Sequence, residues 1–286
     1  MDRRTFFKLA AALGLCPGRV LADMTANRNG SLSRAPIEMK GSWPEASPEV
    51  AARVAARVRE ICLTGVQLVS DRQPDRIIVD NHQQGSPAIW LHGDQPEAAW
   101  IILDVGPRDW CKLAYQLGHE LGHVLCNSWE ATARPRPPSQ WLEEALVEAF
   151  SIRGLGMLAR NWAERPPFEG DEAFGAAIAD YRKKLLEMYR AEAAKERAAD
   201  AAAWFHNDRK VLESGLAAPK GLAVLEIIAL FDRDKKLVCD LGAANRWASR
   251  TGVPLEEYLT LWEKSCRETG APGRLPAQLR NAFGVS

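Results

Sequence analysis

The sequence predicts an α+β protein in which a part with a small sheet and two long helices is followed by a mostly helical part. Between residues 66 and 105, short apolar and β-branched runs are separated by Gly, Pro, Asn and Asp, as is typical of strands joined by turns. From Asp109 onward apolar residues recur at helical spacing, and beyond Pro166 nearly the whole chain keeps this pattern. With 286 residues, of which 47% are hydrophobic, the chain can bury a substantial core.

Residues 1–22 are expected to form a signal peptide. Arg3 and Arg4 precede an apolar stretch, Leu9 to Leu15, that is too short to span a bilayer, and a small-residue cleavage site ends at Ala22. The arginine pair resembles the twin-arginine export motif, although Asp2 and Phe7 replace its usual residues, and ordinary Sec export is the alternative. We therefore expect a periplasmic or secreted mature chain without an integral membrane segment.

The first elements of the mature chain are a helix and a sheet. The helix is expected to begin at Ser47, which precedes a proline and a glutamate and is followed by apolar residues along one face as far as Ile61. The residues before Ser47 form a polar, proline-containing stretch. Strands are expected at Val66–Val69, Arg76–Val79, Ala88–Leu91 and Trp100–Val105.

Helices account for nearly all of the remaining chain. One is predicted from Asp109 to about Cys126, and after a Pro-rich loop a second runs from about Gln140 to Arg160. An Ala-rich, charge-laced helical stretch from 171 to about 208 is expected to be largely solvated. Further helices are expected near 219–232, 239–250 and 254–268.

Charge and cysteine content exclude several classes of function. The 37 basic and 37 acidic residues cancel without a long run of one sign, so neither nucleic acid nor an anionic membrane surface is an expected partner. Removal of the signal peptide leaves five of the six cysteines, which allow at most two disulfides. Because none of them forms a C-x-x-C pair, a cysteine zinc site is not expected.

The segment Y-Q-L-G-H-E-L-G-H-V-L, residues 115 to 125, places the motif H-E-x-x-H inside a predicted helix. Because an α-helix turns once in about 3.6 residues, His119 and His123 project from one face and can bind a single metal ion. Glu120 lies beside that face, where its carboxylate can act on a water molecule but cannot complete the coordination. A chance occurrence of the motif is rare in a chain with five histidines, so it predicts a metal site.

The third ligand distinguishes the classes of zinc hydrolase. A metzincin needs Gly at position 126 and His at position 129, and this chain has Cys126 and Trp129, so that class is excluded. The remaining common choice is a glutamate on the next helix. The segment W-L-E-E-A-L-V-E-A-F, residues 141 to 150, offers Glu143, Glu144 and Glu148.

Helix geometry favours Glu144 as this ligand. If the two helices pack antiparallel, Glu144 lies level with His123, whereas Glu143 is rotated by about 100° and points elsewhere. Glu148 is only about 40° from Glu144 but a turn further along. It is therefore expected to accept the second N–H of a ligating histidine, His119, and to orient that ring.

These residues together resemble the gluzincins, the peptidase MA-like family that includes the thermolysin and aminopeptidase N groups. Twenty residues, 124 to 143, separate His123 from Glu144, which is close to the family's spacing. The sequence W-L-E-E-A-L-V-E resembles the family's second-helix motif, in which the glutamate ligand precedes a supporting acidic residue by four positions. The aminopeptidase marker G-x-M-E-N is absent, which argues against an exopeptidase.

The resemblance, which covers about 50 residues from the strand ending at Val105 through Ser151, implies a zincin-like part at 23–160 and a helical part at 161–286. It also implies one Zn²⁺ ion and a downstream Tyr or His that stabilises the oxyanion. His206 is the first candidate for this role, and the others are Tyr181, Tyr189 and Tyr258. His82 and His92 are expected to be loop or sheet residues.

The function expected from these features is that of an exported zinc metallopeptidase in which Glu120 is the general base. Its substrate is expected to be a peptide that pairs with an edge strand, Ala88–Leu91, in a cleft between an α/β part ending near Gly156 and the helical part. Two alternatives remain, a non-catalytic binding or scaffold protein that keeps the zinc fold and a zinc amidase acting on a non-peptide bond of the cell wall. The sequence predicts no oligomeric state.

Overall fold

The computed structural model describes residues 31–43, 45–66, 72–82, 85–130, 135–216, 221–248, 250 and 252–286. The expected signal peptide and most of the strand expected at Val66–Val69 lie outside this described part. Within it the fold is α+β, as predicted, with one small mixed sheet and many helices. None of the described helices is long and apolar enough to cross a membrane.

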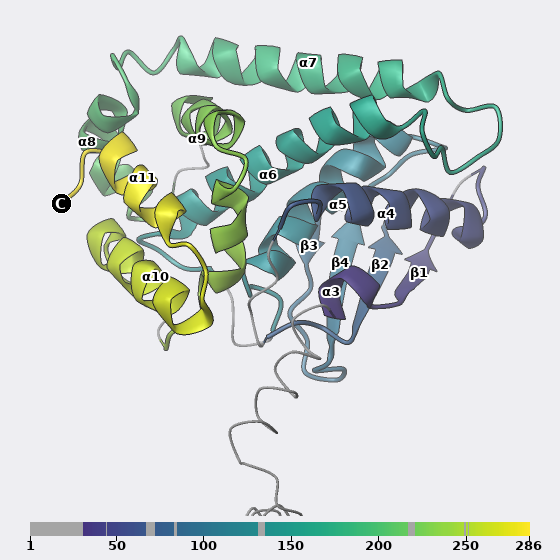
Figure 1. The fold of residues 1–286 in the computed structure, drawn as a ribbon, viewed down its shortest axis with the longest axis horizontal. Coiled ribbons are helices and arrows are strands. Elements are labelled where there is room, and N and C mark those ends of the chain that lie inside the picture. Colours follow the sequence, from purple (N-terminus) through teal and green to yellow (C-terminus); the bar gives the residue numbers. More distant parts are fainter. Residues whose placement is uncertain are drawn as a thin grey trace, which may run out of the picture.

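The sheet has four strands in the order β1-β2-β4-β3. β1, β2 and β4 are parallel, and the short strand β3 pairs antiparallel with β4 at one edge (Figure 1). Alternate residues of the central strands, such as Val79 and Ile101, are buried in the main core. Three predicted strands are thus confirmed with shifted ends. The bounds are Ile37–Gly41 for β1, Arg76–Asn81 for β2, Ala88–Ile89 for β3 and Ala98–Leu103 for β4.

Strand β1 was not predicted, because its residues were placed in a polar stretch. Apolar and charged residues alternate over only a few positions, and the strand is half-buried. It is held by pairing with β2, in the register Ile37 opposite Ile77. A partner so distant in the sequence leaves no signal in a local pattern.

Three helices connect the sheet to the rest of the molecule. α4 (Pro48–Cys62) begins as predicted, with the Ser47 hydroxyl accepting a hydrogen bond from the Val50 amide. α5 (Trp110–Leu125) is capped in the same way by Asp109, and α6 (Gln140–Asn161) follows. α4 and α5 lie across one face of the sheet, and α6 packs against both (Figure 1).

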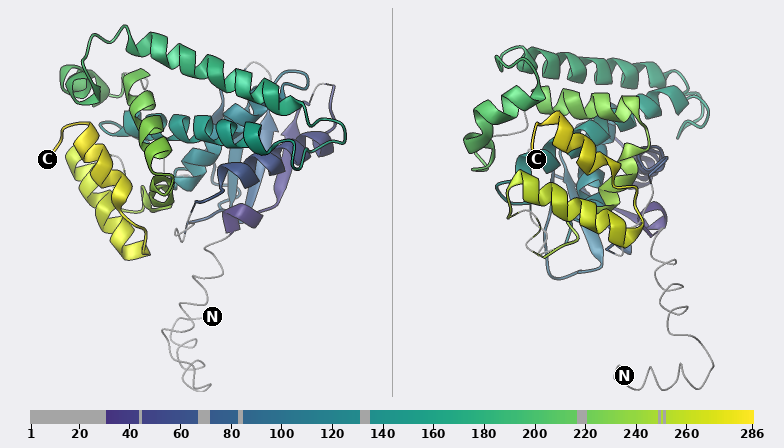
Figure 2. Two further views of the ribbon diagram at one scale, coloured as in Figure 1. Left: turned by 45° about the horizontal axis from the view of Figure 1, so that its top comes forward. Right: turned by 60° about the vertical axis from the view of Figure 1, so that its left-hand side comes forward.

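The remaining helices pack around α6 and beyond its N-terminal end (Figure 2). The stretch predicted from 171 to 208 is broken into two helices, because Asp200 caps a new helix by accepting from the Ala203 amide. The prediction of a helix near 239–250 is wrong, because a 3₁₀ helix and an irregular turn occupy this region. The bounds are α7 Phe174–Ala193, α8 Ala201–Leu212, α9 Gly221–Arg233, η1 Leu237–Ala243, α10 Leu255–Thr269 and α11 Arg274–Ala282, and α3 (Ser31–Arg34) precedes β1.

An aromatic cluster fixes the first turn of α6. The Trp141 ring lies 5.2 to 5.5 Å, between centroids, from the rings of Trp204, Phe205 and Phe283. All four side chains are buried. The start of α6, where the predicted ligand lies, is therefore anchored to the C-terminal part. The five cysteines of the described residues are all unpaired.

Candidate metal centre

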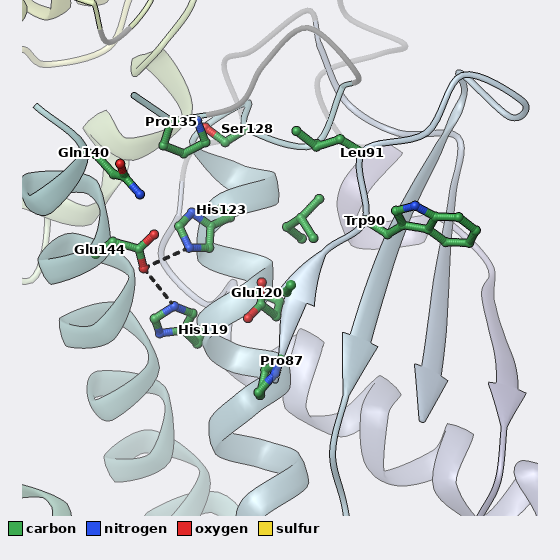
Figure 3. A pocket seen from close by; sticks show the side chains of 12 residues that line it. Pro87, Trp90, Leu91, His119, Glu120, His123, Ser128, Pro135, Gln140 and Glu144 are labelled. Atoms are coloured by element: carbon green, nitrogen blue, oxygen red, sulfur yellow. Dashed lines mark ion pairs between the residues drawn. The ribbon is translucent and has the colours of Figure 1, made fainter. Parts of the chain in front are cut away.

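Three side chains from α5 and α6 converge on one point. Nε2 of His119 and Nε2 of His123 each lie 3.4 Å from Oε2 of Glu144. Their potential ligand atoms all lie within 4.8 Å of one another. Figure 3 shows the two imidazoles and the carboxylate pointing toward each other across the gap between the helices. The structure thus brings together the three ligands expected from the sequence.

Close packing of α5 against α6 makes this convergence possible. A glycine precedes each histidine, and a methyl group at Gly122 would lie 2.8 Å from Cβ of Val147. At Gly118 it would lie 3.0 Å from Oγ of Ser151. The contact at Gly122 is closer than real Cβ atoms show, so this position needs the smallest residue, whereas at Gly118 the Ser151 side chain would have to shift to admit a methyl group. The repeated Gly-His pair in the sequence is therefore also a packing signal.

His119 is held from behind by a carboxylate and tyrosine hydroxyls. Its Nδ1 lies 2.9 Å from Oε2 of Glu148, as the sequence predicted. The Tyr115 hydroxyl donates to the same carboxylate at 2.8 Å, and Tyr189 also hydrogen-bonds to Glu148. With Nδ1 donating to Glu148, Nε2 is the nitrogen left for a metal.

His123 has a matching support that the sequence analysis missed. Its Nδ1 lies 2.8 Å from Oε1 of the fully buried Glu143. The prediction that Glu143 points elsewhere is correct only for the metal position. The helical rotation that takes its carboxylate away from Nε2 brings it against the other nitrogen of the same ring. A second acidic residue directly before the predicted ligand was the available signal.

A buried polar network extends from Glu143 into the C-terminal part. The Asn245 amide donates to Oε2 of Glu143 at 2.7 Å and to the Cys126 carbonyl at 3.0 Å. The Tyr258 hydroxyl in turn donates to Oδ1 of Asn245 at 3.0 Å. Asn245 has a positive φ of 56°, a conformation that asparagine tolerates better than most residues. No local motif marks Asn245 or Tyr258 as part of this site.

Negative charge surrounds the two imidazoles. Burial alone would lower the pKa of His119, but hydrogen bonds with Glu144 and Glu148 outweigh it and raise the pKa to about 9. Burial would raise the pKa of Glu144, but hydrogen bonds from both histidines hold it well below its usual range. Such a site favours a bound cation. Two imidazole nitrogens and one carboxylate oxygen fit Zn²⁺, and these three ligands leave a coordination position open.

Glu120 has a buried carboxylate oxygen without a partner among the described residues. Its side chain is 2% exposed, and no described residue hydrogen-bonds to its Oε2. Burial raises the pKa of Glu120 above its usual value, although the neighbouring histidines counteract part of this effect. An unpaired buried carboxylate oxygen lowers the stability of the folded protein. Such an oxygen therefore calls for an explanation, and a catalytic role is one. Its position beside the predicted ligands gives it access to a water molecule or a substrate.

The three ligands and Glu120 line a cavity of about 470 Å³. Residues 87–91, which include edge strand β3, form the facing wall (Figure 3). The cleft thus lies between β3 and α6, and not at the boundary near Gly156 that the sequence suggested, since α6 continues through that residue. Its other polar side chains are Ser128 and Gln140.

The structure does not bring the predicted oxyanion residue to this cavity. His206 is exposed on α8, where its ring lies beside Phe205 and the backbone of Gly284. Tyr189 and Tyr258 lie behind the histidines, and the Tyr181 ring packs on Tyr115. Among the described lining residues there is no tyrosine.

Two further histidines lie in the sheet region, as expected. His82 pairs with Asp80 at 2.9 Å, and the His92 ring packs against Trp100. Neither lies among the three side chains that could hold a metal ion, which are His119, His123 and Glu144. Comparison with protein-family models, with curated proteins and with solved structures gave no match for this chain.

Proposed function

We propose that this protein is a zinc-dependent metallopeptidase, with one Zn²⁺ held by His119, His123 and Glu144. The observation that carries the proposal is the convergence of these three donors at a cavity where a fourth residue, Glu120, keeps a buried oxygen unpaired. The resemblance of the sequence to gluzincins agrees with this arrangement. The same reasoning assigns a zincin-like fold to the part that contains the sheet, α5 and α6.

The metal, when bound, would supply a Lewis acid that polarises a carbonyl group and makes water a better nucleophile at neutral pH. Glu120 would accept the proton of the attacking water and deliver it to the leaving nitrogen. The raised pKa of Glu120 favours this role, because a carboxylate that is too acidic is a poor base. Glu143 and Glu148 would keep the histidine rings oriented throughout.

The edge strand supplies a means of holding a peptide. β3 pairs with β4 on one side only, and residues 87–91 line the cavity. An extended peptide can add to such an edge through backbone hydrogen bonds. Its peptide bonds would then lie beside Glu120 and the three ligands. The expected substrate is therefore an unfolded or extended polypeptide segment. The expected signal peptide, residues 1–22, implies that the enzyme is exported and that these residues are removed.

The decisive test compares the wild-type mature protein with Glu120→Gln. Glutamine keeps the size and hydrogen bonding of the side chain but cannot accept the proton, so the variant should bind one zinc ion and lose turnover on the order of 10²-fold or more. Zinc content, thermal stability and cleavage of a broad peptide library are measured in parallel. Glu169→Gln, an exposed substitution on the loop before α7, is the matched control.

Two outcomes would contradict the proposal. If the wild type cleaves no peptide and Glu120→Gln equals it in zinc content and stability, a binding or scaffold role takes its place. If only cell-wall fragments are cleaved, the protein is an amidase with a different substrate class.

A further inference from the structure

A second cavity, of about 270 Å³, lies where the C-terminal half of α6 meets α7, the end of α9 and the turn after α4. It shares no lining residue with the cavity of the metal centre. The whole chain has 37 basic and 37 acidic residues, so its formal charges cancel. The excess of positive charge at this cavity is therefore local. Its charged lining consists of five cations and one carboxylate: Arg153, Arg160, Arg182, Lys235, Lys236 and Asp232.

Two of the arginines are fixed in place by backbone carbonyls. Arg153 donates from Nη1 to the Cys62 carbonyl at 3.2 Å and from Nη2 to the Thr64 carbonyl at 2.9 Å. Arg182 donates from Nε to the Ile152 carbonyl at 3.0 Å. A methyl group at Gly156 would lie 2.8 Å from Nε of Arg182, so this guanidinium rests on bare helix backbone. These two guanidinium groups are therefore held by the fold at the cavity.

These cations differ from ordinary surface cations of the same molecule. Lys183 and Lys264 lie on exposed helix faces, 3.9 Å from glutamates one turn away. By contrast, none of the five cations of the cavity forms an ion pair with a carboxylate of the described residues. Cations that are only solvated on an exposed helix face have no physical reason to gather around one cavity, as these five do.

The arginines disfavour one another's charge. Burial lowers the pKa of Arg153, and although Cys62 and Cys239 oppose this shift, the positive charge of Arg160 adds to it. The pKa of Arg182 is lowered by burial and by Arg160, while Asp232 opposes the shift. An anion in the cavity would offset both burial and repulsion.

We propose that this cavity binds a phosphate group. Guanidinium groups anchored on different elements, with lysines at the rim, present donors from several directions to a tetrahedral anion. A phosphate group carries about −1.5 to −2 charges at pH 7, which matches the excess of cations better than a single carboxylate does. The phosphate can be free in solution or part of a lipid headgroup. This inference does not depend on the proposed peptidase activity.

The test measures binding of inorganic phosphate to the metal-free mature protein by calorimetry, with chloride replacing phosphate at constant ionic strength. Metal-free protein is used because phosphate can also bind zinc. The variant is Arg160→Gln/Lys236→Gln, since both side chains are exposed and the fold should tolerate their loss. Lys183→Gln/Lys264→Gln removes the same charge elsewhere and is the control. We expect the dissociation constant for phosphate to rise tenfold or more in the cavity variant only.

A second arm uses vesicles that contain phosphatidic acid, a lipid whose headgroup is a phosphate monoester. Vesicle binding that is lost in the cavity variant but not in the control would assign the phosphate to a lipid headgroup. Binding of soluble phosphate lost in the same way would assign it to a free phosphate. The proposal is overturned if the wild type binds neither probe, or if the cavity variant and the control weaken binding equally.

Discussion

The two histidines of the metal centre are supported by different regions of the molecule. His119 rests on Glu148, whose carboxylate is held by tyrosine hydroxyls from α5 and α7. His123 rests on Glu143, whose carboxylate is held by an asparagine from the segment before α10. The imidazole–carboxylate contact is the same in both, yet the first connects the site to α7 and the second connects it to the segment between η1 and α10. We therefore expect these two equivalent contacts to differ in their effect on stability.

The largest effect is expected from the residue that both histidines share. Glu144→Ala removes the oxygen that faces both Nε2 atoms, so zinc affinity should fall by more than the roughly 10- to 100-fold expected for a supporting residue. Competition with a chromogenic chelator measures this affinity. Equal zinc retention in Glu144→Ala and Glu143→Ala would refute the assignment of the ligand.

Replacing each supporting glutamate by glutamine should distinguish the two regions. Both Glu143→Gln and Glu148→Gln are expected to weaken zinc binding by about 10- to 100-fold. This replaces the expectation from sequence that Glu143 has little influence. Only Glu143→Gln should also destabilise the metal-free protein, by about 1–3 kcal/mol, because an amide donor is placed against other donors in a fully buried site.

The reason for the difference is the chemistry of the neighbours. In Glu148→Gln a tyrosine hydroxyl beside the new amide can rotate and accept a hydrogen bond, whereas in Glu143→Gln the neighbouring Asn245 amide nitrogen can only donate. Denaturant unfolding of the metal-free variants measures the contrast. Equal losses of stability would show that the two supports are interchangeable.

A smaller effect on zinc affinity is expected when the contact between Glu143 and the segment before α10 is removed. Asn245→Ala leaves the Cys126 carbonyl and one oxygen of Glu143 without this donor, at a cost of about 1–3 kcal/mol. Zinc affinity should fall less than in Glu143→Gln, since the carboxylate remains. Asn161→Ala, whose amide donates only to the Met157 carbonyl of its own helix, is the control. Similar unfolding free energies for these two variants would contradict the proposed link.

The smallest effect is expected at the other support. Tyr115→Phe removes one hydroxyl from Glu148, which keeps its contacts with Tyr189 and His119. The loss of stability should be about 0.5–1.5 kcal/mol, with little change in zinc affinity. Thermal unfolding with and without zinc provides both values. A loss of zinc affinity as large as that of Glu148→Gln would show that Tyr115 itself positions the ring.

The parts of the site that the sequence predicted are those set by local helix geometry. His119 and His123 follow from one turn of helix, and Glu144 and Glu148 follow from the next helix at matching height. Helix rotation correctly places Glu143 away from the metal position, but it does not predict which side chain contacts the second nitrogen of His123. The second nitrogen of His123 faces the other way, and only the packed structure shows what lies there.

The parts that were missed depend on contacts between distant residues. β1 is stabilised by a strand about forty positions away, and the turn at Asn245 is held by groups of α5, α6 and α10. The long Ala-rich stretch looked continuous because neither Asp200 as a cap nor the positive φ of Arg197 is evident from periodicity. His206 was chosen from its place in the order of the chain, and tertiary packing directs it elsewhere.

The separation of Glu143 from Asn245 bears on the order in which the site forms. His119 and Glu148 are 29 positions apart, whereas Glu143 and Asn245 are 102 positions apart. Contacts between close neighbours in the chain form with less loss of entropy and generally earlier. During synthesis the ligands can therefore meet while the stretch of chain that carries Asn245 is still on the ribosome. A metal ion bound at that moment would meet a His123 whose supporting carboxylate still lacks its asparagine donor, so we expect it to dissociate faster than from the complete protein.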